Sequence, residues 1–77
     1  MSVKVKFFAS LADVVGARDA TCEYAPSMTV SQVWSVISSD KDLPNGMLCA
    51  RNQAYCDLED SVEDGDEVAF FPPATGG

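Results

Sequence analysis

The segment MTVSQVWSVIS, residues 28–38, constrains the fold most, because it carries the clearest helix signal in the chain. Thr29 is a candidate N-cap and Gln32 follows three residues later, which is the arrangement of a capping box. Met28 and Val33 fit the hydrophobic staple that often accompanies such a box. One apolar stripe at helical spacing is formed by Val30, Val33, Trp34 and Ile37. We place Trp34 at the centre of the core.

The first part of the chain predicts two strands with a short helix between them. Apolar side chains alternate with lysines over residues 3–7, which is typical of a strand with one buried face. Ser10 is expected to cap a short helix that Gly16 ends. A second strand is expected over residues 20–24, ended by Pro26, and it should pair with the first strand as a hairpin-like unit.

The second part of the chain predicts a break followed by three strands. The polar stretch DKDLPNG, residues 40–46, should end the long helix. Asn52 and Gln53 are expected to form a tight turn between two short strands. A further turn at residues 64–66 leads into the last strand, expected over residues 67–71.

The predicted order is therefore β-β-α-β-(β)-β, with an additional short helix after the first strand. One amphipathic helix needs one sheet to cover it, so the sequence predicts a two-layer α+β domain. The first and last strands are the most apolar, and we expect them to lie side by side at the centre of the sheet. We assign residues 1–71 to the folded domain and residues 72–77 to an extended C-terminal tail.

The charge and hydropathy of the chain exclude several function classes. Twelve acidic against five basic residues give a net charge of −7, which argues against nucleic acid and against anionic membranes as partners. Seven of the acids lie in residues 57–67, and some of these are expected to steer the domain toward a basic partner. The alternative is that they only keep a small protein soluble. No apolar run reaches the roughly 18 residues of a membrane span, and no signal peptide is recognisable, so we expect a cytoplasmic protein.

The residues that usually carry side-chain chemistry are scarce. The three cysteines, Cys22, Cys49 and Cys56, are unevenly spaced and form no CxxC motif, so we expect small buried hydrophobic residues. The chain has no histidine to complete a zinc site or to activate a serine or cysteine. We therefore expect no metal, no permanently bound cofactor, no side-chain catalysis and no redox or persulfide role for Cys56.

The last eight residues, FFPPATGG, offer a different reactive group. Two prolines cannot donate to a strand ladder, so the strand should stop at Phe71. The six residues from Pro72 onward can span roughly 20 Å when extended, and two glycines permit close approach of the backbone to a narrow site. A frayed terminus is the bland alternative.

The whole chain resembles the small, sulfur-carrying subunits of molybdopterin synthase, the MoaD family. The matching stretches are VKVKFFASLADVVG, ARNQ and DGDEVAFFPPATGG. This resemblance implies a ubiquitin-like β-grasp fold with a four- to five-stranded mixed sheet. It implies that an E1-like adenylyltransferase consumes ATP to activate the carboxylate of Gly77, and that a sulfur donor protein then converts it to a thiocarboxylate. It further implies delivery to the cyclic pyranopterin precursor in the pocket of a large subunit, within a heterotetramer of two small and two large subunits.

The predicted site consists of the tail and an apolar patch at its root. Strand alternation places Phe71 on the face opposite the core, and Phe8 should lie beside it as an exposed patch. We assign the chemistry to Gly77 and tail flexibility to Gly76. The predicted partner-binding residues are Phe8, Phe71, Pro72, Pro73, Ala74 and Thr75.

Rival functions remain open at this point. A sulfur carrier of thiazole biosynthesis would share the fold and the Gly-Gly end. A ubiquitin-like modifier would form isopeptide bonds with lysines of target proteins. A ferredoxin-like electron carrier is disfavoured, because the three cysteines lack the spacing of a cluster site.

Overall fold

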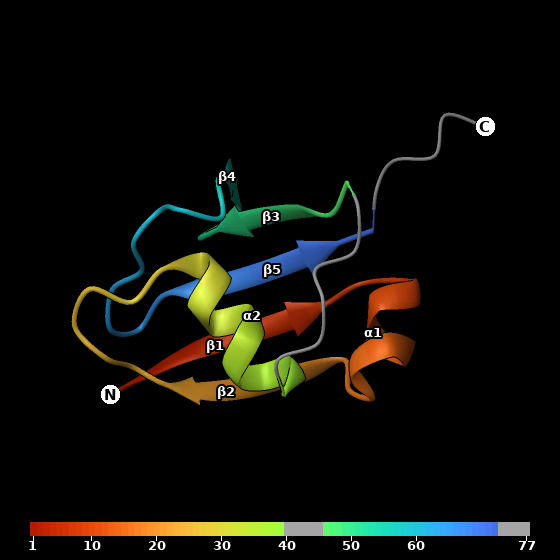
Figure 1. Ribbon diagram of the computed structural model, residues 1–77, viewed down its shortest axis with the longest axis horizontal. Helices are drawn as coiled ribbons and strands as arrows, with labels where there is room; N and C mark the ends of the chain where they lie inside the picture. Colours follow the sequence, from red (N-terminus) through yellow and green to blue (C-terminus); the bar gives the residue numbers. More distant parts are fainter. Residues whose placement is uncertain (40–45, 73–77) are drawn as a thin grey trace.

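The computed structural model describes residues 1–39 and 46–72, which form one mixed sheet with a helix packed across one face (Figure 1). The sheet has five strands in the order β2-β1-β5-β3-β4. This confirms the predicted α+β architecture. The elements are β1 (Ser2–Phe7), α1 (Ser10–Val15), β2 (Asp19–Glu23), α2 (Val30–Ser38), β3 (Leu48–Arg51), β4 (Ala54–Cys56) and β5 (Glu67–Phe71).

The first and last strands lie side by side at the centre of the sheet, as predicted. β1 and β5 are parallel, with Lys4 opposite Glu67 and Phe7 opposite Phe70. β2 pairs with the free edge of β1 and β3 with the free edge of β5, both antiparallel. The strand that precedes Pro72 is therefore held on both sides.

The capping box predicted at the start of α2 is present. The Thr29 hydroxyl accepts a hydrogen bond from the Gln32 backbone N–H at 3.3 Å, and the Gln32 side chain accepts one from the Thr29 N–H at 2.8 Å. The helix ends at Ser38, and Ser39 adopts a left-handed conformation with φ 59°. Residues 40–45 of the predicted break lie outside the described residues.

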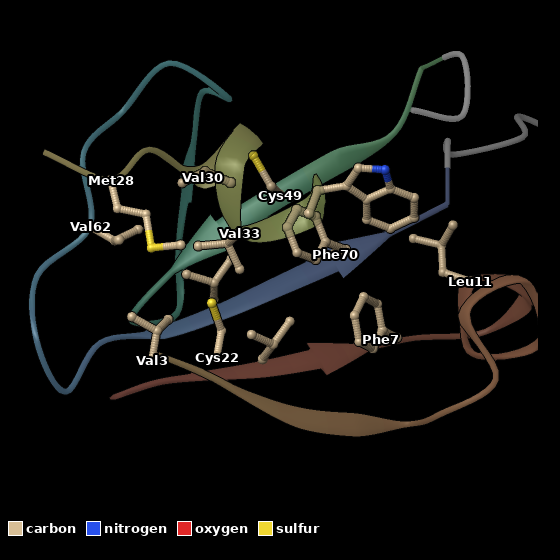
Figure 2. Close-up of a cluster of buried hydrophobic side chains, with 13 residues drawn as sticks. Val3, Phe7, Leu11, Cys22, Met28, Val30, Val33, Cys49, Val62 and Phe70 are labelled. Atoms are coloured by element: carbon tan, nitrogen blue, oxygen red, sulfur yellow. The ribbon is translucent and has the colours of Figure 1, made fainter. Parts of the chain in front are cut away.

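The core lies between α2 and the sheet and is built around three aromatic side chains (Figure 2). Trp34 contacts Phe7 and Phe70 edge-on, with ring centroids 6.1 and 5.3 Å apart, and Phe7 stacks on Phe70 at 5.8 Å. All three side chains are buried, which confirms the central position predicted for Trp34. Ile37, the fourth member of the predicted stripe, is partly buried against this cluster.

The predicted cap of α1 is wrong. Ser10 lies inside the helix, and the N-cap position is occupied by Ala9, with no side-chain capping bond. The Phe8 N–H still donates to the Phe70 carbonyl at 3.1 Å, so the chain stays on the sheet through Phe8 and must turn at the next residue. Ala9 makes this turn with φ 53° and ψ −132°, a region that residues with a Cβ disfavour. Gly16 ends the helix in a left-handed conformation, as predicted.

Candidate functional site

Two phenylalanines meet on the open face of the sheet, opposite α2. Phe8 directly follows β1 and Phe71 ends β5, and their rings stack with centroids 4.9 Å apart and planes 8° from parallel. Phe8 is 43% exposed although it is a large apolar side chain. The adjacency of the two rings that strand alternation predicts is confirmed, although Phe71 is only partly exposed.

Tyr55 of β4 completes this aromatic patch, which we define as Phe8, Tyr55 and Phe71. The Tyr55 ring lies 6.2 Å from that of Phe71, and the residue is 78% exposed. Sequence reasoning missed Tyr55, but the Asn52-Gln53 turn carried the signal. A two-residue turn places Tyr55 opposite Ala50, and alternation then directs it away from the neighbouring, partly buried Cys56.

A shallow hollow runs across the same face of the sheet and joins the patch to polar groups. Two of its lining residues, Lys6 and Glu67, form an ion pair, with Nζ and Oε2 3.6 Å apart. The lining residues are Lys6, Phe8, Ala50, Gln53, Tyr55, Glu67, Ala69 and Phe71. An apolar centre bordered by charged and amide groups is typical of a surface that another protein covers.

The aromatic patch lies at the point where the predicted tail begins. Pro72 directly follows Phe71, is partly buried and belongs to no regular element. The other predicted tail residues, Pro73, Ala74, Thr75, Gly76 and Gly77, lie outside the described residues. The structure therefore fixes the root of the predicted tail next to the patch, and the roles assigned to the tail residues stay predictions.

The buried carboxylate of Asp66 connects two parts of the sheet through hydrogen bonds. Asp66 accepts hydrogen bonds from Arg51 Nε at 2.5 Å, Asn52 Nδ2 at 3.0 Å and the Glu63 backbone N–H at 2.7 Å. Burial by itself would raise the pKa of Asp66, but the hydrogen bonds from Asn52 and Arg51 outweigh it and hold that pKa below its ordinary value. The network ties the β3–β4 turn to the start of β5.

Most of the other acids in residues 57–67 face solvent. Five of the seven are exposed, while Asp66 is buried and Glu67 is partly buried. The exposed acids are Asp57, Glu59, Asp60, Glu63 and Asp64. Asp66 is committed to its hydrogen bonds, so the predicted electrostatic steering can rest on the exposed acids alone.

Residues 1–39 and 46–72 contain neither a metal-binding cluster nor a membrane-spanning helix. No three His, Cys, Asp or Glu side chains in this part of the chain are grouped so that they could hold a metal ion. None of the described helices is long and apolar enough to cross a membrane.

The order of the strands and the single covering helix define a ubiquitin-like β-grasp domain, with the aromatic patch at the end of β5. The ThiS family matches residues 5–77. The chain is 41% identical over 81 residues to the molybdopterin synthase sulfur carrier subunit of Escherichia coli (strain K12), covering 97% of this chain and 99% of that protein. It therefore belongs to the ThiS family and, within it, to the molybdopterin synthase sulfur carrier subunits.

Solved structures agree with this assignment of the fold. SAMP1 from Haloferax volcanii superposes with a TM-score of 0.83 at 28% identity, with both chains fully covered. A subunit from the complex of subunits 1 and 2 of the molybdopterin-converting factor of Helicobacter pylori 26695 superposes with a TM-score of 0.68 at 21% identity, again over the full length of both chains. The predicted β-grasp fold and the predicted family are thus both confirmed.

Proposed function

We propose that this chain carries sulfur for a molybdopterin synthase, on the C-terminal carboxylate of Gly77. The observation that carries the proposal is the position of the aromatic patch at the last residue of β5, directly before the Pro-Pro-Ala-Thr-Gly-Gly segment. A partner protein that covers the patch is therefore also close to the point where residues 72–77 begin. Membership in the carrier family supplies the chemistry.

Activation is needed because a carboxylate is a poor electrophile. An E1-like adenylyltransferase joins the Gly77 carboxylate to AMP, releasing pyrophosphate from ATP, and a sulfur nucleophile from a donor protein then displaces AMP to leave a thiocarboxylate. ATP is a substrate of the activating enzyme, and this chain itself binds no cofactor. These steps need no catalytic side chain from this chain, whose sequence contains no histidine. We expect the protein to act in the cytoplasm, where ATP is available.

Delivery then takes place in a second protein. The thiocarboxylate enters the pocket of the large subunit and donates its sulfur to the cyclic pyranopterin precursor. In this proposal the large subunit holds the catalytic pocket, and two small and two large subunits form the assembly. Pro72 and Pro73 favour an extended course and reduce the entropy lost on threading, Ala74 and Thr75 contact the walls of the pocket, and Gly76 lets the backbone bend at its narrow end.

The aromatic patch is the docking surface in this proposal. Phe8 and Phe71 present a rigid stacked pair, and Tyr55 adds a ring whose hydroxyl can remain hydrated at the rim. Aromatic anchors of this kind contribute most of the binding energy at many interfaces. Phe71→Ala should therefore weaken binding to the large subunit by at least tenfold. The matched control Val36→Ala changes an exposed side chain on the opposite, helical side of the domain and should leave binding unchanged.

Intact mass spectrometry of the protein from cells tests the proposal. Replacement of one terminal oxygen by sulfur adds about 16 Da, and deletion of Gly77 should abolish both this shift and the formation of molybdopterin with purified large subunit. Normal sulfur delivery by the Gly77-deleted chain would overturn the proposal. Rescue of thiazole synthesis without rescue of molybdoenzyme activity would favour the thiazole carrier, and Gly77 found linked to lysines would favour a modifier.

A further inference from the structure

Two of the three cysteines face each other across the edge hairpin. In the β3–β4 register Cys49 lies opposite Cys56, and their Sγ atoms are 3.5 Å apart. Cys56 Sγ donates to Cys49 Sγ, and Cys49 Sγ donates to the Cys56 carbonyl oxygen at 3.1 Å. Both thiols are free in this structure. Their contact is independent of the aromatic patch and of the tail.

The backbone beneath this pair already has the spacing that a disulfide needs. Cys49 and Cys56 stand two residues out from the pair that flanks the two-residue turn, so they occupy a hydrogen-bonded site with Cα atoms about 5.5 Å apart. Disulfides bridge Cα separations of about 4.4–6.8 Å, most often near 5.5–6 Å. To bond, the sulfurs must therefore close only the gap from 3.5 Å to the bond length of about 2.05 Å.

The two thiols differ in access, which sets the order in which they can react. Cys49 is 4% exposed, whereas Cys56 is partly exposed. A shallow hollow includes both cysteines among its lining residues, which are Met47, Leu48, Cys49, Tyr55, Cys56, Asp57, Leu58 and Glu59. A small reagent that enters this hollow meets the more accessible Cys56 thiol first.

In contrast to the sequence, which led us to expect no redox role for Cys56, the contact between the two sulfurs leads to a different inference. We propose that Cys49 and Cys56 form a reversible dithiol–disulfide site that accepts small-molecule disulfides, such as oxidised glutathione, as oxidants. The Cys56 thiolate attacks one sulfur of glutathione disulfide, expelling one glutathione thiolate and leaving a mixed disulfide on Cys56. Cys49 then loses its proton to solvent and attacks the Cys56 sulfur, expelling the second glutathione. Two protein thiols are thereby oxidised by two electrons, and one glutathione disulfide is reduced to two thiols.

The surroundings make this exchange slow but selective. Burial, reinforced by the hydrogen bond from Cys56 and by the carboxylates of Asp57 and Asp60, raises the pKa of Cys49 to about 12. Burial also raises the pKa of Cys56, although the hydrogen bond with Cys49 and the charge of Arg51 oppose the shift. Thiolate is therefore scarce at neutral pH, and the rate should rise as the pH is raised from 7 to 9. The second step is favoured by the short distance between the two sulfurs, which are already near attack distance.

Cys22 serves as an internal reference for the pair. It is buried on β2, at the opposite edge of the sheet from β4 (Figure 1), and its Sγ donates to the Glu23 carbonyl oxygen. With two strands or more between them, Cys22 cannot reach either member of the pair while the sheet is intact. A disulfide that includes Cys22 therefore reports unfolding.

In the experiment, the reduced 77-residue chain is incubated with oxidised glutathione at pH 8 in the absence of oxygen. The remaining free thiols are then alkylated in denaturant, and the chain is digested with trypsin. Arg51 lies between the two cysteines, so trypsin separates them into residues 42–51 and 52–77 unless a disulfide joins these peptides. We expect the joined pair, about 2 Da lighter than the two free thiol peptides, with Cys22 alkylated. Dithiothreitol should separate the peptides.

Three controls complete the test. Cys22→Ala should form the same link at the same rate, Cys49→Ala should accumulate a stable glutathione adduct on Cys56, and chain unfolded in urea should lose the selectivity for the pair. The measurement on the wild-type chain tests the proposal even if one of the variants fails to fold. The proposal is overturned if the folded wild-type chain keeps all three thiols, stops at mixed disulfides, or links Cys22 as readily as Cys49.

Discussion

The substitution Asp66→Asn tests how much one buried carboxylate contributes to the stability of the sheet. Asp66 is 7% exposed and accepts three hydrogen bonds, two of them from side chains of the β3–β4 hairpin, Arg51 and Asn52. Asparagine has nearly the same shape and keeps one acceptor oxygen. It loses the negative charge and the second acceptor, so the hairpin loses part of its attachment to the start of β5.

The size of the effect follows from these contacts. A hydrogen bond to a charged group contributes about 1.5–3 kcal/mol. Asparagine retains some of the bonding, and the Arg51 side chain, 33% exposed, can be rehydrated. We therefore expect the free energy of unfolding to fall by about 2 kcal/mol at pH 7, which for a domain of this size lowers the Tm by roughly 10 °C.

The pH dependence has a definite sign. The pKa of Asp66 is lower in the folded state than the unfolded value of about 3.9. Its stabilising contribution is therefore complete above the unfolded pKa and is lost as the pH falls through the folded pKa. The difference between wild type and Asp66→Asn should be constant from about pH 7 to 5 and shrink below about pH 4.

Urea unfolding followed by circular dichroism at several pH values measures this difference. Glu63→Gln is the matched control, because the Glu63 side chain is 78% exposed and only 3.9 Å from Arg51 at its nearest point. That control should change stability by less than about 0.5 kcal/mol. A loss for Asp66→Asn as small as that of the control, or one that persists undiminished at pH 3, would refute the reasoning.

Three other substitutions address backbone strain, capping and packing. Ala9→Gly should stabilise the fold by about 1 kcal/mol, because glycine tolerates φ 53° and ψ −132° without a Cβ clash; a lower Tm would contradict the strain. Thr29→Ala removes the hydroxyl that accepts a hydrogen bond from the Gln32 N–H, so the free energy of unfolding measured in urea should fall by about 1 kcal/mol. The same change at an exposed threonine outside a cap should have a smaller effect. Phe70→Ala removes the ring between Phe7 and Trp34, and should cost about 3–5 kcal/mol; retention of the wild-type urea midpoint would show that the ring is dispensable.

Elements governed by local sequence were predictable. The capping box of α2, the alternation in β1 and the Asn52-Gln53 turn depend on residues a few positions apart, and each is present in the structure. Both turn residues have positive φ, 52° and 71°, as in the primed turns that join hairpin strands. The stack of Phe8 on Phe71 on the open face of the sheet was predictable once the two strands were expected to be adjacent.

Two features that the sequence did not reveal depend on contacts between residues that are far apart in the chain. Asp66 was recognised as part of a turn, but its burial requires Arg51 and Asn52, which are 15 and 14 positions away. The incorrect cap at Ser10 has the same origin, because the bond from Phe8 to β5 decides where the chain leaves the sheet. The contact of Cys49 with Cys56 could have been predicted, because the predicted turn at Asn52 and Gln53 already places these two residues opposite each other.

The central position of β5 has a consequence for folding. β1 and β2 are close in sequence and can pair early, but the sheet is complete only when β5 has inserted between β1 and β3, more than 50 positions after β1 ends. The direction in which Pro72 leaves the sheet is set by that late insertion. A chain that has not finished folding therefore lacks a defined direction in which Pro72 leaves the sheet, and it also lacks the neighbouring aromatic patch. An activating enzyme that requires both features would act on folded domains and not on unfolded chains.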